Sequence, residues 1–245
     1  MKAGDPLSRI RVVLSRPSHP GNIGATARAM KTMGLARLYL VRPKSFPHAD
    51  ARAMATGARD VLDSAQACKT LAEALAGTTF SVALSARKRS LSHPPLAPRA
   101  AAREIASAAR HEEVALVFGN ETVGLSNKEV MQCSRIARIP ADARYSSLNL
   151  AQAVQVMVYE VRMAALAPAV PSPKIEYATH EELERFYAYL ERSLTASGTL
   201  HPRDPRKLMD RLRRLFAKAR LEKVEINILR GMWRSGTNRT SKRNS

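Results

Sequence analysis

The amino-acid sequence predicts an α/β protein, in which a mainly parallel sheet carries helices on its faces and a small all-helical extension follows. Three observations support this fold class. Short apolar runs alternate with helix-like stretches up to residue 167, as in parallel sheets with crossover helices. Prolines then gather within residues 168–174, which is typical of an extended linker. Beyond them, apolar residues recur only with helical spacing.

Five strands are expected in the first domain, because five short runs are rich in Val, Ile, Leu and other strand-favouring residues. In chain order these runs cover residues 11–15, 37–41, 80–86, 114–119 and 135–140. Since helix-like stretches separate them, we expect the strands to be parallel, with loops at their carboxyl ends forming the site.

Helices are expected between these strands, and the first covers about residues 22–33. The next begins at Thr70, where Glu73 completes a capping box. Another follows Ser126, which makes the same box with the glutamate three residues later, so we expect Ser126 to act only as a cap. A long apolar helix that starts at Asn149 closes the domain.

The domain boundaries follow from these patterns. We expect a first domain over residues 1–167, a linker over 168–174, a helical extension over 175–235 and a disordered tail over 236–245. In the extension, a capping box at Thr179 opens one helix, and Pro205 suits the first turn of the next.

The charge of the chain favours a polyanionic partner. The 245 residues include 40 Lys and Arg against 21 Asp and Glu, a formal net charge of +19. Basic residues gain affinity for nucleic acids by displacing counterions from phosphates, so nucleic acid is the leading partner. The first residues lack a signal peptide's apolar core, and no uncharged apolar run approaches the roughly 20 residues of a membrane span. We therefore expect a cytoplasmic protein without a membrane partner.

The two cysteines, Cys68 and Cys133, lack the paired spacing of a zinc site or a disulfide framework. We expect both to be small buried apolar residues, and the sequence predicts no metal site.

The helix that starts near Pro205 has two distinct faces. Leu208, Leu212 and Leu215 share the face that is expected to pack. Another face carries four basic residues, which we call the basic ridge: Lys207, Arg211, Arg214 and Lys218. A solvated helix face is one interpretation of the ridge, and contact with phosphates is the favoured one.

Loops after three of the expected strands carry the residues best suited to chemistry. The first contains Gly21 and Gly24, which permit tight turns, and leads into a helix with Arg28. Its glycine spacing differs from that of a dinucleotide loop and also fits the Gly-x-x-Gly clamp of a KH module. In the second, FGNETVGLSN, Gly119 would let the backbone approach a ligand, and a plain structural turn is the alternative.

The third loop ends in YSSLNLAQ, with Ser146, Ser147 and Asn149 before an apolar helix that has no charge as far as Tyr159. Ser and Asn commonly cap helices by accepting bonds from free N–H groups. A helix cap is therefore one interpretation of these residues. Two serines and an asparagine are more than one cap requires, so the more specific interpretation is that they line a ligand or catalytic site. Since such loops meet beyond the carboxyl ends of the strands in open α/β sheets, we expect the three to converge.

Three stretches resemble, in order, the motifs of the SPOUT class (TrmH-like) of RNA 2′-O-ribose methyltransferases: NIGATARAMKTMG, LVFGNETVGLSN and YSSLNLAQAVQV. The helical part is similar to bacterial TrmJ-type tRNA methyltransferases through ELERFYAYLERSL, LMDRLRRLFAKAR and EINILRGM. The resemblance covers residues 9–232. It implies a carboxy-terminal trefoil knot in the sheet domain and a homodimer with the knots at its interface. It also implies methylation of the 2′-hydroxyl of nucleotide 32, a cytidine or uridine, in the tRNA anticodon loop.

The resemblance further implies S-adenosylmethionine as cofactor, folded into the knot and held largely by backbone groups. The matching positions around it are Leu84, Ser85, Ala86, Gly119, Ile139, Ser146, Ser147 and Leu148. Three of these side chains are apolar and suit an adenine face. Asn120 departs from the pattern, because a charged residue or proline is expected there in this subgroup.

For the reaction, a weakly acidic ribose hydroxyl must attack a sulfonium methyl group. The resemblance implies Arg28, contributed across the dimer, as the central catalytic residue, with Ser147 and Asn149 positioning the hydroxyl. A guanidinium is a poor base because it hardly deprotonates in proteins. We therefore expect Arg28 to bind the adjacent phosphate and stabilise the developing oxyanion. Arg87 and Arg89, beyond the third strand, are expected to contact substrate phosphates.

Three alternatives remain. A non-catalytic RNA-binding protein would use the same basic surface but would leave the third motif without a purpose. A SPOUT methyltransferase acting on a different tRNA or rRNA nucleotide would share all these motifs. A nicotinamide-dependent oxidoreductase is disfavoured, because the chain lacks both its glycine spacing and a ribose-binding acid after the second strand.

Overall fold

The structure is a computed structural model. It describes residues 5–87, 94–142, 144–145, 147–168, 175–200 and 205–241. Over residues 205–207 and 234–241 it describes only the backbone. The chain divides into two compact units, residues 1–172 and residues 173–245, and the division falls among the prolines of the expected linker.

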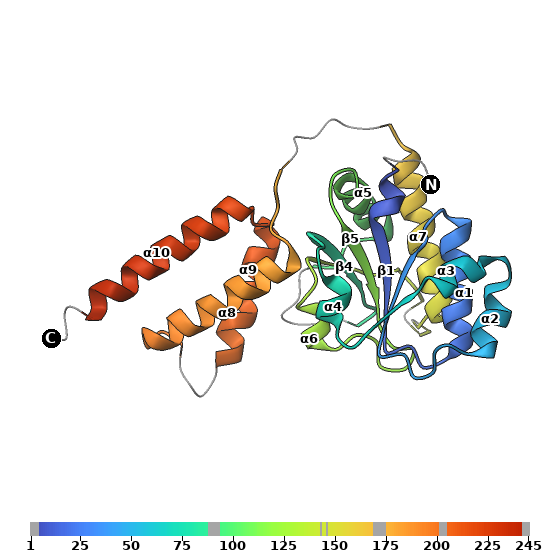
Figure 1. The fold of residues 1–245 in the computed structure, drawn as a ribbon, viewed down its shortest axis with the longest axis horizontal. Coiled ribbons are helices and arrows are strands. Elements are labelled where there is room, and N and C mark those ends of the chain that lie inside the picture. Colours follow the sequence, from blue (N-terminus) through green and yellow to red (C-terminus); the bar gives the residue numbers. More distant parts are fainter. Residues whose placement is uncertain are drawn as a thin grey trace. The chain divides into compact units, whose positions relative to one another are not determined.

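A six-stranded parallel sheet forms the centre of the first unit (Figure 1). The strands are β1 (Ile10–Ser15), β2 (Arg37–Val41), β3 (Gln66–Cys68), β4 (Phe80–Leu84), β5 (Val114–Phe118) and β6 (Arg135–Ala137). They lie in the order β3-β2-β1-β5-β4-β6, and every neighbouring pair is parallel. The predicted parallel α/β sheet with helices on its faces is confirmed for this unit, and all five predicted strands are present.

Three strands end earlier than the sequence predicts. β4 ends at Leu84, β5 at Phe118 and β6 at Ala137. The residues that follow therefore leave the sheet and are available to the loops beyond it. β3 was not predicted, because its residues are exposed or half-buried at the edge of the sheet and form no apolar run.

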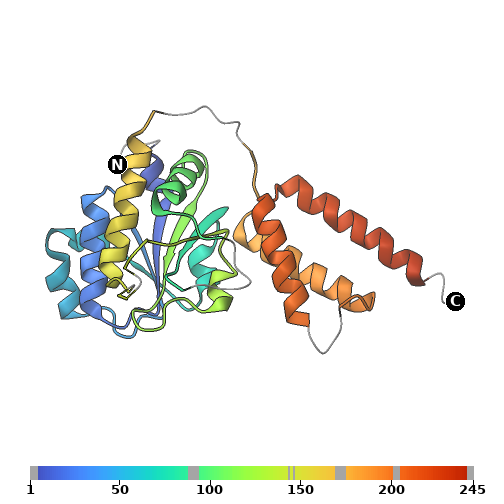
Figure 2. The same ribbon diagram turned by 180° about the vertical axis from the view of Figure 1, so that it is seen from behind.

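Helices cover both faces of the sheet, because side chains alternate along each strand. On one face lie α1 (Pro20–Thr32), α2 (Ala49–Ala55), α3 (Arg59–Asp63), α5 (Pro98–Ala108) and α7 (Leu150–Leu166). On the other lie α4 (Leu71–Leu75) and α6 (Asn127–Val130). Figure 2 shows α7 between α1 and α5 on the first face. Two short 3-10 turns, η1 (Pro6–Arg9) and η2 (Thr56–Ala58), complete the unit.

The first helix begins at Pro20, earlier than expected, because proline loses no hydrogen bond in a helix's first turn. Gly21 therefore lies in the first turn of α1, and Gly24 lies inside the helix, as the expected range of 22–33 implies. The freedom of these glycines to form tight turns is not used, and they form no clamp of the KH kind. Gly24 instead permits close packing: a Cβ there would lie 2.0 Å from the carbonyl oxygen of Ala51 in α2.

The described residues of the second unit form three helices: α8 (His180–Ala196), α9 (Pro205–Ala219) and α10 (Lys223–Ser241). Their core surrounds Phe186, whose ring meets that of Phe216 edge-on with centroids 5.3 Å apart. Arg213 lies 4.3 Å from the centre of the Tyr187 ring and pairs with Glu184. The backbone of α10 extends into the segment that composition predicts to be disordered.

The predicted packing face of α9 is wrong at one position. Leu208 and Leu212 pack against the core, but Leu215 is 57% exposed. Met209 and Phe216 contribute to the core instead, so the packed face is turned away from Leu215. Over the described part of the chain, no helix is both long and apolar enough to cross a membrane.

Candidate active site

A cavity lies at the carboxyl ends of β4, β5 and β6, where the loops after these strands meet the start of α7. Its lining includes most of the expected cofactor positions: Leu84, Ser85, Ala86, Gly119, Ile139, Ser147 and Leu148. Ser146 lies outside the described residues. The fold therefore brings together residues from the loops after β4, β5 and β6, whereas the loop after β1, which was also expected to converge here, contributes none of the described lining residues.

Arg87, which is expected to contact substrate phosphates near the cofactor, also lines this cavity. Its side chain is exposed, so it can face an anionic ligand. Arg89, its expected companion, lies outside the described residues.

The loop from Gly119 to Leu125 forms one wall of the cavity, and its shape explains the first glycine. A Cβ on Gly119 would lie 2.2 Å from the backbone nitrogen of Leu125, because the loop returns onto its own start. Gly124 has a φ of +65°, in the left-handed region that favours glycine. Closure of the loop thus requires Gly119, whether or not a ligand approaches it.

Asn149 satisfies both interpretations of the third motif. Its side-chain oxygen accepts hydrogen bonds from the N–H groups of Ala151, at 2.9 Å, and Gln152, at 3.4 Å, and so caps α7. Its side-chain amide donates to the side-chain oxygen of Asn22 at 2.9 Å. The cap of α7 is therefore also joined to the first turn of α1.

Glu121 is a residue that the sequence analysis missed. Its carboxylate accepts hydrogen bonds from the backbone and hydroxyl of Ser18, from the backbone of His19 and from the side chain of Asn22. Burial opposes ionisation, yet the hydrogen bonds from Asn22 and Ser18 outweigh it and lower the pKa of Glu121 to about 2. Through Asn22 and Asn149, this carboxylate connects all three motifs.

Arg28 lies elsewhere. It projects from the exposed side of α1 and is not part of the cavity lining. Within the described residues, its guanidinium has no hydrogen-bond or ion-pair partner. A free guanidinium is available to an anion or to another protein chain.

The cysteines are poorly suited to bind a metal. Cys133 is buried, and burial raises the pKa of its thiol to about 12. Cys68 is only half-buried, in contrast to the prediction, and burial again raises its pKa. Among the residues that the structure describes, no group of three His, Cys, Asp or Glu side chains is placed to hold a metal ion.

The fold and the pocket agree with the family matches of the sequence. Residues 9–159 match the SpoU rRNA Methylase family, so the chain belongs to that family and is a methyltransferase. Residues 181–245 match the C-terminal domain of the tRNA methyltransferase TrmJ. The resemblance to the TrmJ group is thereby confirmed in both units.

Curated relatives match nearly the full chain. The tRNA (cytidine/uridine/adenosine-2′-O-)-methyltransferase TrmJ of Pseudomonas aeruginosa strain UCBPP-PA14 is 50% identical over 238 residues, which cover 92% of this chain and 93% of that protein. The tRNA (cytidine/uridine-2′-O-)-methyltransferase TrmJ of Klebsiella pneumoniae is 50% identical over 232 residues, covering 92% of this chain and 95% of the relative.

Solved structures also share the fold. TrmJ from Z. mobilis ZM4 has a TM-score of 0.80 at 34% identity, covering 92% of this chain and 97% of its own. A putative methylase family protein from Neisseria gonorrhoeae has a TM-score of 0.70 at 43% identity, covering 78% of this chain and 99% of its own.

Proposed function

We propose that the chain is an S-adenosylmethionine-dependent tRNA 2′-O-ribose methyltransferase that acts on cytidine or uridine at nucleotide 32 of the anticodon loop. The observation that carries this proposal is the convergence of the loops after β4, β5 and β6 in one cavity. The names of the relatives support tRNA, the 2′-hydroxyl and these bases. The choice of nucleotide 32 rests on the motifs in the sequence.

The cavity suits the cofactor's mixed chemistry. Leu84, Ile139 and Leu148 give it apolar walls for an adenine ring, while the loop backbone and Ser147 supply polar groups. When bound, S-adenosylmethionine supplies an electrophilic methyl group. The protein's task is then to hold the ribose hydroxyl in line with that group and to exclude competing water.

Ser147 lines the cavity and Asn149 starts the helix beside it, so both are placed to orient the ribose hydroxyl. Arg28 would bind the neighbouring phosphate and stabilise negative charge on the 2′-oxygen as it develops. Proton removal is assigned to phosphate or water, because a guanidinium is a poor base.

We extend the proposal to a trefoil knot and a homodimer. Three large apolar side chains on α7 are exposed in the single chain: Tyr159 at 47%, Met163 at 48% and Leu166 at 66%. Their spacing of four and three residues puts them on one stripe of the helix, which favours a protein partner. Because Arg28 is absent from the cavity of its own chain, a second copy that presents Arg28 would complete the site.

In the second unit, the basic ridge is proposed to hold tRNA. Arg211 and Lys218 are exposed and Arg214 is half-buried, while the side chain of Lys207 is not described. Exposed basic groups can exchange their counterions for tRNA phosphates, whereas Arg213 is already paired inside the unit.

The proposal is tested in two stages. Isothermal titration of the purified protein with S-adenosylmethionine should show binding; its absence would favour a non-catalytic RNA-binding protein. Ribose methylation is then mapped in tRNA from a strain that lacks the gene and from the same strain carrying it. Loss and recovery of methylation at nucleotide 32 supports the assignment, whereas loss at another tRNA or rRNA nucleotide would keep the class and replace the target.

A further inference from the structure

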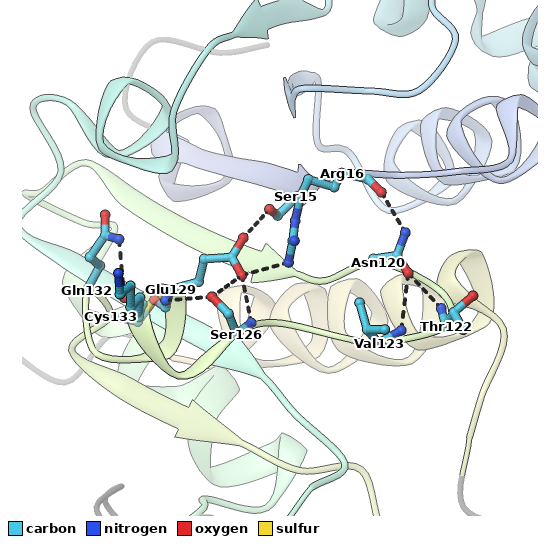
Figure 3. A network of polar contacts seen from close by, with 10 residues as sticks. Ser15, Arg16, Asn120, Thr122, Val123, Ser126, Glu129, Gln132 and Cys133 are labelled. Carbon is cyan, nitrogen blue, oxygen red and sulfur yellow. Dashed lines mark hydrogen bonds and ion pairs between the residues drawn. The ribbon is translucent and has the colours of Figure 1, made fainter.

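A network of polar contacts joins the end of β1 to the loop that forms the cavity wall and to α6 (Figure 3). In the loop, Asn120 is the residue whose side chain makes the contacts of this network. Its side-chain amide donates a hydrogen bond to the backbone carbonyl of Arg16 at 2.8 Å. Its side-chain oxygen accepts bonds from the backbone N–H groups of Thr122, at 2.9 Å, and Val123, at 3.1 Å.

The amide oxygen and the amide nitrogen of Asn120 therefore have different roles. The oxygen shapes the loop from within, as asparagine does in turns. The amide nitrogen fixes that shaped loop to a separate element of the fold. A backbone bond of 2.8 Å from Gly124 N–H to the Asn120 carbonyl closes the same loop.

Arg16 is a firm anchor for this link. Its φ of +53° lies in the left-handed region, which non-glycine residues adopt only when the surroundings hold them there. Its N–H donates to the carbonyl of Val41 in β2 at 2.7 Å. Its guanidinium pairs with Glu129 at 3.0 Å. The backbone of Arg16 is thus held to the sheet, and its side chain is held to α6.

Glu129 completes the anchor. The sequence predicts that Ser126 and Glu129 only cap α6, and their capping box is present. The Glu129 carboxylate also accepts a bond from the hydroxyl of Ser15 as well as pairing with Arg16. Burial opposes its ionisation, yet the hydrogen bonds from Ser126 and Ser15 outweigh burial and lower its pKa. The cap therefore also connects α6 to β1.

We propose that Asn120 is a positioning residue for the cofactor, which holds the loop from Gly119 to Leu125 in its binding shape by fastening it to the carbonyl of Arg16. This inference rests on the proposed function of the cavity. Asn120 acts on affinity for the cofactor, because the loop forms the wall of that pocket.

Two variants separate the two roles of the side chain. Asn120→Asp keeps an oxygen for Thr122 and Val123 but replaces the donor toward Arg16 with an acceptor, while Asn120→Ala removes both. Each should raise the Kd for S-adenosylmethionine, measured by calorimetry, about fivefold or more, in line with the loss of one hydrogen bond. The rate at saturating cofactor and tRNA should stay within about twofold, which gives a KM effect without a kcat effect.

Gln132→Glu is the matched control, because it adds a negative charge on the turn after α6 and leaves the bonds of Asn120 in place. Its Kd should stay within about twofold of the wild type. Asn120→Ser, which adds no charge and shortens the donor's reach, provides a further variant if Asn120→Asp does not fold.

The outcomes are distinct. If the wild type fails to bind S-adenosylmethionine, the proposed function is wrong. If the wild type binds and Asn120→Ala weakens binding while Asn120→Asp and Asn120→Ser do not, the link to Arg16 is dispensable and the inference is overturned. A lower melting temperature with unchanged Kd in all three variants would also overturn it, because the side chain would then serve stability alone.

Discussion

The side chains of Asn149 and Asn22 meet at 2.9 Å, so that the residue capping α7 is bonded to the first turn of α1. Asn22 also donates to Glu121 at 3.0 Å. One side chain thus joins the loop after β5 to the start of α7. The first and third motifs are therefore parts of a single hydrogen-bonded unit.

We expect Asn22→Ala to lower kcat/KM for tRNA methylation about tenfold or more, because it breaks both hydrogen bonds that hold the three motifs together. Thr32→Ala on the same helix is the control, since the Thr32 hydroxyl donates to the carbonyl of Arg28 within α1. Steady-state kinetics measure the effect. Equal kcat/KM values for the two variants would show that the Asn22 contact is not needed for catalysis.

Arg28→Ala should lower turnover by on the order of 10² or more while leaving S-adenosylmethionine affinity nearly unchanged, because Arg28 acts on charge that develops in the transition state. Lys31→Ala is the control, because Lys31 is another exposed cation on α1 and pairs with Asp60 of α3. Single-turnover methylation and cofactor titration measure the two quantities. Retained single-turnover activity in the Arg28 variant would remove Arg28 from the mechanism.

If Arg28 serves the site of the opposite subunit, two inactive chains should complement each other. Mixing an Arg28→Ala chain with an Asn149→Ala chain should restore one working site in each heterodimer once subunits exchange. Differently tagged chains allow exchange to be verified by co-purification. Continued inactivity of verified heterodimers would argue that each site is built within one chain.

The pKa of Glu121 predicts a specific loss of stability in acid. Its pKa of about 2 in the folded protein lies below the ordinary value of 4.5, so ionised Glu121 stabilises the fold above the ordinary value. This contribution declines as the pH falls from 4.5 toward 2. Chemical denaturation of wild type and Glu121→Gln should show their stabilities converging over that interval. Parallel curves at all pH values would contradict the role of the charge.

The basic ridge should set the salt dependence of tRNA binding. Changing Lys207, Arg211, Arg214 and Lys218 to Gln should weaken tRNA binding without altering cofactor affinity. The slope of log affinity against log salt should become shallower by somewhat less than one unit per lost phosphate contact. Filter binding across several salt concentrations measures this slope. An unchanged slope would mean that the ridge is only a solvated helix face.

The sequence predicted the parts of the fold that rest on apolar repetition. The strands β1, β2, β4 and β5 each contain at least three consecutive apolar residues, so the sequence predicts their positions directly. The edge strand β3 carries no such run. On α9, the alternative spacings of three and four residues both fit the sequence, so the burial of Phe216 rather than Leu215 could not be predicted.

At the site, the motifs predicted which residues would gather but not how they would be joined. Asn149 was expected either as a cap or as a site residue, and its two ends allow both. Glu121 is a single carboxylate in a loop, so no periodic pattern marks it in the sequence. Its role depends on the hydrogen-bond donors that the fold places around it. The reach of Asn120 to Arg16 likewise depends on a contact across more than a hundred residues of chain.

The absence of a side chain at Gly24 bears on how natural variation in this protein should be judged. Even alanine would place a carbon 2.0 Å from a backbone oxygen of α2, so one of the two helices would have to move. Asn22 lies half a turn away on α1 and would move with it. A systematic mutational scan would therefore find Gly24 as intolerant of substitution as the catalytic residues, although Gly24 is placed in no ligand contact. Intolerance at this position would reflect the close spacing of α1 and α2. Catalysis would be affected only indirectly, through the displacement of α1.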